Sequence, residues 1–289
     1  MRIIKFLTSN CLYILWFVIY FTLAWALLGL AIDGLIIVSV VYGVSIIIAL
    51  SPIGENLLRL LENCREPLTD KERLYLLPLF EEVYESAKEI SPKLNDNIKL
   101  YVMDVMFVNA FAIGRQTIAV TKGAIETFTE YELKGILAHE FGHMTYGHTK
   151  ALLLSVIGNF FFSVVIFLYK LILYLFQMVA TIASFFNAVG VILSFFVLIM
   201  RWVLEIGVFI FITLSQIILA LNSRTNEIQA DRFAYDIGYG RELIAGLYLI
   251  QKIDITTKVK LIDRAKASHP HLAYRIGELE ILENEDIEE

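Results

Sequence analysis

Two long segments of this chain of 289 residues carry almost no charge, and they restrict its possible folds more than any other feature. Residues 12–50 contain one charged side chain, Asp33. Residues 151–221 contain three, which are Lys170, Arg201 and Glu205. A helix needs about 20 apolar residues to cross the roughly 30 Å of hydrocarbon in a bilayer. These first and second apolar blocks therefore predict a multi-span membrane protein.

The composition agrees with a membrane protein and excludes several other classes. Hydrophobic residues make up 57% of the chain and charged residues 19%, whereas a soluble domain has about 45–50% apolar and about 25% charged residues. The net charge is −6, which argues against a nucleic-acid binder because such proteins neutralise phosphates. Two cysteines, Cys11 and Cys64, are too few for a disulfide scaffold.

Each apolar block is expected to form a membrane hairpin. In the first block, the Asp33-Gly34 pair is a turn signal that predicts helices over residues 12–32 and 35–50. A signal peptide is the alternative, but the apolar run continues beyond its possible cleavage site at Ala24-Trp25-Ala26, which favours an uncleaved anchor. The second block favours two spans. A segment in the interface around residues 185–191, or four short spans, remain alternatives.

Basic residues near the ends of the blocks set the expected orientation. Cytoplasmic flanks of membrane spans are enriched in Lys and Arg. If each block is a hairpin, one side of the membrane receives Arg2, Lys5, Arg59, Arg65, Lys150, Arg224 and Arg232. Both polar segments and both termini are therefore predicted to be cytoplasmic.

The polar segments show simple secondary-structure patterns. Residues 74–90 have helical spacing of apolar residues, and a further helix is expected from Glu130. The β-rich runs 99–108 and 117–121, with Gly114 between them, predict a small antiparallel sheet. Residues 278–289 are mostly acidic and are expected to fray from a helix into a solvated tail.

A metal-binding pattern lies on the helix expected from Glu130. His139 and His143 are four residues apart, so both imidazoles lie on one face and can bind one ion. Zinc suits such a pair because it takes nitrogen and oxygen ligands and leaves one position for water. Glu140 would then act as a general base towards that water. His148 follows five residues after His143 and is expected off this face, at the surface.

A third ligand is expected directly after the second apolar block. Glu227 and Asp231 are four residues apart. Glu227 is a candidate ligand, and Asp231 is a candidate partner for the far nitrogen of a ligand histidine, which would fix its orientation. Both motifs must lie on one side of the membrane to share an ion, so an even number of spans must separate them.

With these motifs in place, the sequence resembles the M48 family of membrane zinc metallopeptidases, among them the HtpX-like heat-shock proteases. The resemblance covers nearly the whole chain and rests on four motifs in order. These are Asn109-Ala110-Phe111-Ala112 with Gly114, the HExxH motif at residues 139–143, Ser223-Arg224 leading to Glu227 and Asp231, and His269-Pro270 followed by Arg275-Ile276.

The resemblance implies a role for each matching residue. His139, His143 and Glu227 would bind one Zn²⁺ per chain, Glu140 would activate water, and Asp231 would orient a ligand histidine. The strand containing Asn109 and Ala110 would bind an extended substrate by β-addition. His269 and Arg275 would contact the substrate near the scissile carbonyl. For the last two, a turn histidine and a surface arginine are the alternative. His271 stands where a second proline is common in the family, and it competes with His269 for that role.

The resemblance also implies a fold and a function. The expected fold is a mainly α integral membrane protein, with about four transmembrane helices and a cytoplasmic α+β zincin-like metalloprotease domain. The segments are residues 1–50 (first hairpin), 51–150 (catalytic, first part), 151–221 (second hairpin) and 222–289 (catalytic, second part, with the acidic tail). The expected function is a zinc metalloendopeptidase of a prokaryotic plasma membrane that cleaves misfolded or membrane proteins in protein quality control, with the lipid bilayer and no nucleic acid as partner.

Three other functions fit the sequence less well. An intramembrane site-2-type protease would place the HExxH motif inside a span, but Glu132, Lys134 and Lys150 flank it here. The CAAX-type prenyl proteases usually carry more spans than this chain can hold. A non-proteolytic metal-binding transporter or scaffold is the alternative from another class, but a transporter would need ionisable residues along a path inside its spans.

Overall fold

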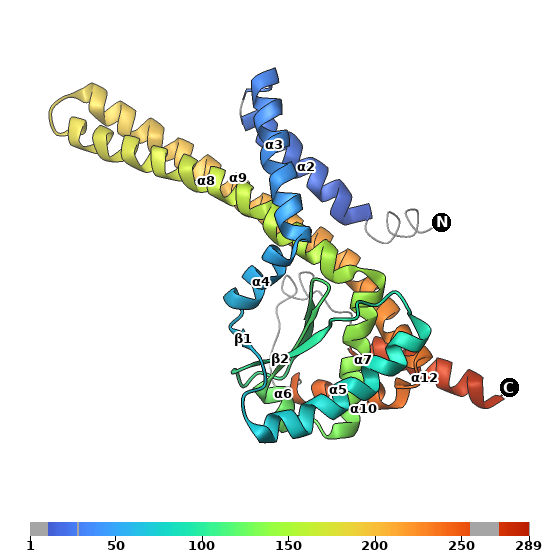
Figure 1. Cartoon of the computed structure of the whole chain (residues 1–289). Coiled ribbons are helices and arrows are strands. Elements are labelled where there is room, and N and C mark those ends of the chain that lie inside the picture. The colour runs from blue at the N-terminus through green and yellow to red at the C-terminus, as the bar shows by residue number, and fades with distance from the viewer. Residues whose placement is uncertain (1–10, 28, 255–271, 289) are drawn as a thin grey trace.

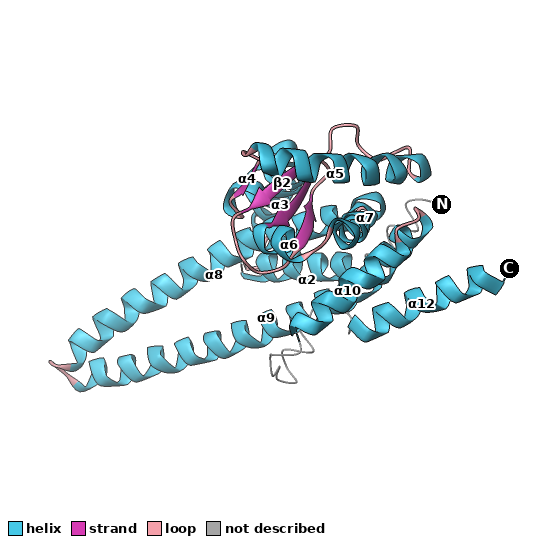
Figure 2. Ribbon diagram, turned by 90° about the horizontal axis from the view of Figure 1, so that it is seen from below, coloured by secondary structure: helices cyan, strands magenta, loops and turns pink. Residues whose placement is uncertain are grey.

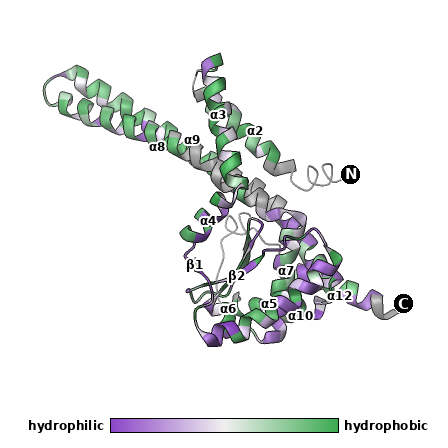
Figure 3. Cartoon of the chain, viewed as in Figure 1, coloured by the Kyte–Doolittle hydropathy of each residue, from purple (hydrophilic) through white to green (hydrophobic). Residues whose placement is uncertain are grey.

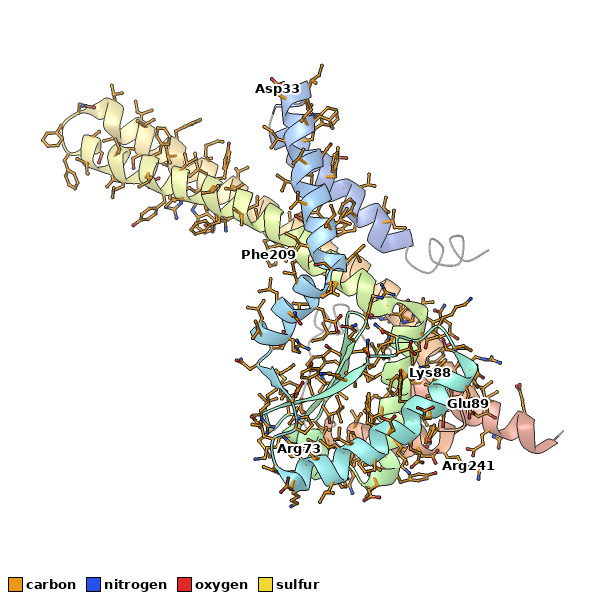
Figure 4. The ribbon with its side chains drawn as sticks, in the orientation of Figure 1. Asp33, Arg73, Lys88, Glu89, Phe209 and Arg241 are labelled. Carbon is orange, nitrogen blue, oxygen red and sulfur yellow. The ribbon has the colours of Figure 1, made fainter. Side chains whose placement is uncertain are left out.

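The structure, a computed structural model, describes residues 11–27, 29–254 and 272–288. It consists of two helical hairpins that extend from a polar part made of helices and a small sheet (Figure 1). Figure 4 labels Asp33 at the tip of the shorter hairpin and Arg73 at the opposite end of the molecule. Figure 3 shows that hydrophobic residues are concentrated in the hairpins.

The first hairpin consists of α2 (Cys11–Leu27) and α3 (Ile32–Leu50). The expected turn at Asp33-Gly34 is wrong, because the chain reverses at Gly29 and Leu30, whose φ angles are +81° and +57°. Gly29 adopts the left-handed region without the cost of a Cβ atom. Asp33 instead lies in the first turn of α3, where the helix dipole favours an acidic residue.

The second block forms two helices, α8 (His148–Ser184) and α9 (Ala188–Asp236). They contact each other, extend away from the sheet, and diverge from their shared turn as they approach the polar part (Figure 2). One turn joins them, and the Asn187 side chain caps α9 by accepting a hydrogen bond from the Gly190 N–H. Four short helices are therefore excluded. Helix α9 continues without a break from the tip of the hairpin into the polar part of the protein.

Among the described residues, three helices are long and apolar enough to cross a membrane. They are Ile32–Leu50, Ile166–Ser184 and Ala188–Leu214. The apolar segment Ile14–Ala26 in α2 is shorter. The structure thus gives three candidate spans and a shorter apolar helix where the sequence predicted about four spans.

Six helices and four strands complete the described part of the chain. The helices are α4 (Pro52–Leu61), α5 (Asp70–Ile90), α6 (Lys122–Thr127), α7 (Glu130–Tyr146), α10 (Gly240–Asp254) and α12 (Leu272–Glu288). The strands are β1 (Cys64–Arg65), β2 (Lys99–Met103), β3 (Ala110–Ile113) and β4 (Thr117–Thr121). The helices predicted over residues 74–90 and from Glu130 are confirmed as α5 and α7, and both begin with a capping box.

The sheet is mixed, with strand order β1-β2-β4-β3, so the expected antiparallel sheet is wrong. Strands β3 and β4 form a hairpin through Gly114, whose φ is +60°. Strand β2 pairs with the other edge of β4. The chain passes through β3 between these two strands, so β2 and β4 run parallel instead of forming an antiparallel hairpin. Strand β3 thereby becomes an edge strand.

The two polar segments share one hydrophobic core. It contains residues from α5, the sheet and α7 together with residues from α9, α10 and α12, such as Phe233, Leu243 and Leu279. The helix expected at the C-terminal end is confirmed as α12, which is helical to Glu288 with Leu279 buried, and the fraying of its end stays a prediction. The Tyr235 hydroxyl also donates a hydrogen bond to the Leu282 carbonyl.

Candidate metal centre

Helix α7 carries the HExxH motif in the interior of the protein. Thr129 and Glu132 cap its first turn, and Leu133, Leu137 and Phe141 are fully buried along its length. The helix ends at Gly147, which adopts φ +78°. This left-handed residue is a common helix end, and here it changes the chain direction so that α8 starts at the next residue.

Helix α9 approaches α7 closely because position 142 is a glycine. A Cβ atom at Gly142 would lie 2.8 Å from the Ala230 Cα and 2.9 Å from the Ala230 carbonyl oxygen. Gly142 adjoins His143, and Ala230 lies about one helical turn after Glu227. The close approach of the two helices therefore brings Glu227 to the histidines.

Three side chains from α7 and α9 converge on one point. The Nε2 atoms of His139 and His143 are 3.1 Å apart. The Glu227 carboxylate lies 3.4 Å from His139 Nε2 and 3.2 Å from His143 Nε2. The exposed fractions of His139 and Glu227 are 5% and 2%, so these polar atoms are shielded from water.

This donor set fits a zinc ion. Tetrahedral ligands at the usual 2.0–2.1 Å from zinc are about 3.3 Å from one another, and the separations in this cluster are 3.1 to 3.4 Å. Two imidazole nitrogens and a carboxylate are a common ligand set of catalytic zinc. Elsewhere in the described chain, no further His, Cys, Asp or Glu joins this cluster.

Behind these three candidate ligands lies a buried network of charges. The Asp231 carboxylate is 2.8 Å from His139 Nδ1. Arg275 donates to both Asp231 oxygens, at 2.7 and 2.5 Å, and lies 3.0 Å from the Glu227 carboxylate. Burial raises the pKa of the Asp231 carboxyl, but Arg275 and His139 outweigh burial and hold this pKa below its usual value. Asp231 therefore stays ionised and keeps its bond to the far nitrogen of His139.

The remaining predicted site residues are placed as follows. Glu140 is 7% exposed and lies on α7 beside His139. Asn109 is exposed and directly precedes β3, of which Ala110 is the first residue, and β3 packs against α7. His269 lies outside the described residues. The described polar contacts of Arg275 are with Asp231, Glu227 and His139, and its side chain is 5% exposed.

The sequence did not point to His148 and Gln229 as part of the centre. His148 is 5% exposed, so its expected surface position is wrong. Its Nδ1 lies 3.0 Å from His143 Nδ1, and its Nε2 lies 3.2 Å from the Gln229 side-chain oxygen. Burial and the nearby His143 lower the pKa of His148 to about 3, so it is neutral. The signal in the sequence is Gly147, which breaks the helical register on which the surface prediction relied.

Comparison with protein-family models gives a match to peptidase family M48 over residues 78–283. This range includes the helices α7 and α9 of the candidate metal centre and most of the sheet. The chain belongs to family M48.

Curated relatives of this M48 protein carry the name HtpX. It is 38% identical over 84 residues to a protease HtpX homolog from Dictyoglomus thermophilum, which covers 28% of this chain and 25% of the relative. It is 35% identical over 72 residues to protease HtpX from Legionella pneumophila, covering 23% and 26% of the two chains. The chain thus spans about a quarter of the length of these relatives in the matches. The predicted resemblance to HtpX-like M48 proteases is confirmed.

A solved structure is also similar to this M48 protein. The crystal structure of S. mikatae Ste24p aligns with 96% of this chain and 64% of that chain. The sequence identity is 21% and the TM-score is 0.48.

Proposed function

We propose that this M48 protein is a membrane-bound zinc metalloendopeptidase, and that His139, His143 and Glu227 bind its single zinc ion. The observation that carries the proposal is the convergence of these three side chains at the separations of a tetrahedral ion, with Glu140 beside them. Three protein ligands are typical of a catalytic zinc site, since a structural site usually has four.

The chemistry divides between the ion and the side chains. Bound zinc supplies Lewis acidity, which lowers the pKa of water towards neutral and polarises a carbonyl. The Glu140 carboxylate accepts a proton from the attacking water and delivers it to the nitrogen of the leaving amine. Since Glu140 is 7% exposed, little bulk water competes for that proton.

Three further side chains hold the ligands in position. Asp231 accepts a hydrogen bond from His139 Nδ1, which leaves Nε2 unprotonated for the metal. The Gln229 oxygen and His148 act in the same way on His143: Gln229 accepts from His148 Nε2, so that His148 Nδ1 accepts from His143 Nδ1.

Arg275 is proposed as a positioning residue, because its described contacts are with Asp231, Glu227 and His139. It neutralises two buried carboxylates that would otherwise repel each other. His269 is proposed, from the resemblance to family M48, to stabilise the oxyanion.

The substrate is proposed to be an extended polypeptide. Strand β3 pairs with β4 on one side only and packs against α7, so an added strand on its free edge would run beside the HExxH helix. Asn109 and Ala110 lie at the start of this strand and are proposed to bind the substrate backbone. Backbone pairing tolerates many sequences, which suits misfolded or membrane proteins as substrates.

The cellular placement is part of the proposal. Residues 1–50 and 151–221 would be membrane hairpins, and 51–150 and 222–289 would form one catalytic domain on the cytoplasmic side of a prokaryotic plasma membrane. Support comes from the three candidate spans and from the shared core of the polar segments. A non-proteolytic metal-binding scaffold or transporter is disfavoured by the three-ligand donor set.

The decisive experiment compares the parent with Glu140→Gln in detergent, on unfolded casein, with the zinc content of both proteins measured. The variant should keep about one zinc and lose about 100-fold or more in cleavage rate, because it retains the ligands but has no general base. Glu227→Ala should instead lose zinc. A Glu140→Gln variant that cleaves like the parent would refute the mechanism.

A further inference from the structure

Helix α4 has its polar and apolar faces reversed relative to a helix of a soluble domain. The residues Ile53, Leu57, Leu60 and Leu61 follow helical spacing and form one stripe, with exposed fractions of 66%, 46%, 73% and 65%. The inward face carries Gly54 and Glu55, both buried. A soluble domain would bury the apolar stripe and expose the carboxylate. We call these four residues the α4 stripe.

The inward face of α4 is fixed to the polar part of the protein. The Glu55 carboxylate accepts hydrogen bonds from the N–H groups of Arg115 and Gln116, both at 2.9 Å, and from the Thr117 hydroxyl at 2.7 Å. Arg59 bonds the Tyr101 hydroxyl, and its guanidinium carbon lies 4.4 Å from the centroid of that ring. The exposure of the stripe therefore follows from an ordered attachment of the opposite face.

Helix α4 also adjoins a candidate membrane span. Ser51 alone separates it from α3, and its hydroxyl bonds the Ile48 carbonyl at 2.7 Å while accepting from the Ile53 N–H at 3.2 Å. Pro52 then starts α4 in a new direction, to the side of α3 (Figure 1). Because α3 is apolar to Leu50, α4 begins directly after the end of a candidate span.

We propose that α4 lies in the lipid–water interface of the membrane that α3 enters, with the α4 stripe inserted among the lipid chains. An amphipathic helix in this position buries its apolar face about 5–10 Å into the headgroup and acyl boundary. The lipid surface is the occupant because the stripe continues the apolar surface of α3 around the corner at Ser51.

This placement has a consequence for the substrate strand. The Glu55 carboxylate holds the turn between β3 and β4, so the depth of α4 sets the distance of that turn from the bilayer. Strand β3 is thereby held next to the membrane surface. If the proposed function is right, the edge strand takes its substrates from polypeptides that leave the bilayer.

The test uses the full chain in phosphatidylcholine–phosphatidylglycerol vesicles, with Cys11 and Cys64 changed to serine. Single cysteines introduced by Leu57→Cys or Leu60→Cys carry an environment-sensitive NBD label. Leu74→Cys is the matched control, because Leu74 is 78% exposed and adjoins Arg73, which lies at the end of the molecule remote from the hairpins (Figure 4).

The labels at Leu57 and Leu60 should emit at shorter wavelength in vesicles and lose about half of their emission to nitroxide-labelled lipid, while the label at Leu74 should change in neither respect. Water-like emission without quenching at both α4 positions would overturn the proposal. A shift to shorter wavelength that grows with the number of protein molecules per vesicle, without quenching by nitroxide-labelled lipid, would also overturn the proposal. It would indicate that the α4 stripe contacts a second copy of the protein.

The measurement needs no catalysis, so it is repeated in the Glu140→Gln background and is independent of the proposed protease activity. A second variant, Leu57→Asp with Leu60→Asp, should cleave a membrane-anchored reporter about tenfold more slowly than the parent and casein at the parent rate, because it weakens insertion and not the metal site. Equal rates of reporter cleavage in parent and variant would contradict the link between α4 and the substrate strand.

Discussion

The contact between Gly142 on α7 and Ala230 on α9 makes a sharp prediction about the metal centre. In Gly142→Ala, the new methyl group would lie 2.8 Å from the Ala230 Cα, whereas ordinary contacts of a Cβ atom begin at 3.4 Å. The atoms in its way are backbone and cannot rotate aside. The two helices must therefore separate by about 0.6 Å at this point.

The separation should weaken metal binding more than it weakens folding. Overpacking costs about 1–3 kcal/mol, and replacing a helical glycine by alanine returns about 1 kcal/mol, so stability should fall by about 0–2 kcal/mol. Ligand distances at a zinc site tolerate only about 0.2 Å. Since Glu227 moves with Ala230, zinc affinity should fall by about 10- to 100-fold, as for other disturbances of ligand position.

The assay is competition for zinc against a chromogenic chelator, combined with thermal unfolding in the same detergent. Gly277→Ala is the matched control, because a Cβ atom at Gly277 meets nothing within 4 Å on helix α12. The control should keep the parent affinity and gain a little stability. If Gly142→Ala binds zinc as tightly as Gly277→Ala does, the helix contact does not position the ligands.

Three more predictions concern individual side chains. Glu55→Ala removes the acceptor of three hydrogen bonds at the β3–β4 turn and should cost about 2–4 kcal/mol in denaturant unfolding. His148→Leu should lower zinc affinity by about tenfold in the same competition assay, whereas His148→Asn, which keeps an acceptor, should bind nearly as the parent does. Hydrogen bonds from Arg65 lower the pKa of Glu72 to about 2. The ion pair between Arg65 and Glu72 therefore stabilises the folded state fully above the unfolded-state pKa of about 4.3, and this stabilisation disappears as pH falls towards 2. Glu72→Gln should therefore lower stability by about 1–2 kcal/mol at pH 7, after solvent screening, and by nearly nothing at pH 2; an equal loss at both pH values would exclude the ion pair as the cause.

Local patterns predicted the long helices of the polar part well. Helices α5 and α7 have strong apolar periodicity and a capping residue in front, and both signals act within a few residues. The turn of the first hairpin was placed wrongly because Asp33-Gly34 suits a turn and also suits the first turn of a helix. The apolar context does not distinguish the two cases.

The sheet was harder to predict because its pairing depends on the whole fold. Residues 110–113 are too few and too poor in β-branched side chains for composition to indicate a strand, and only the resemblance to family M48 implied the strand that the structure shows as β3. Without β3, the two visible β-rich runs look like neighbours in a hairpin. The relative direction of β2 and β4 thus depends on β3, which has almost no signal in its local sequence.

In the candidate metal centre, too, local spacing predicted some contacts, and others depend on the whole fold. The i, i+4 spacing on a helix predicts that His139 and His143 share a face, and the structure brings Glu227 to them. The contacts of His148 and Arg275 depend on a helix break and on the packing of α12, which no spacing rule encodes.

The unbroken path of α9 from the hairpin tip to Glu227 makes the order of synthesis important. The two histidines leave the ribosome first, and the second apolar block must then form its hairpin before Glu227 can return to them. Until that hairpin has formed, the candidate centre holds His139 and His143 without the carboxylate of Glu227. The proposed hydrolytic site is therefore completed late in folding, because it requires the chain to run out along α8 and back along α9.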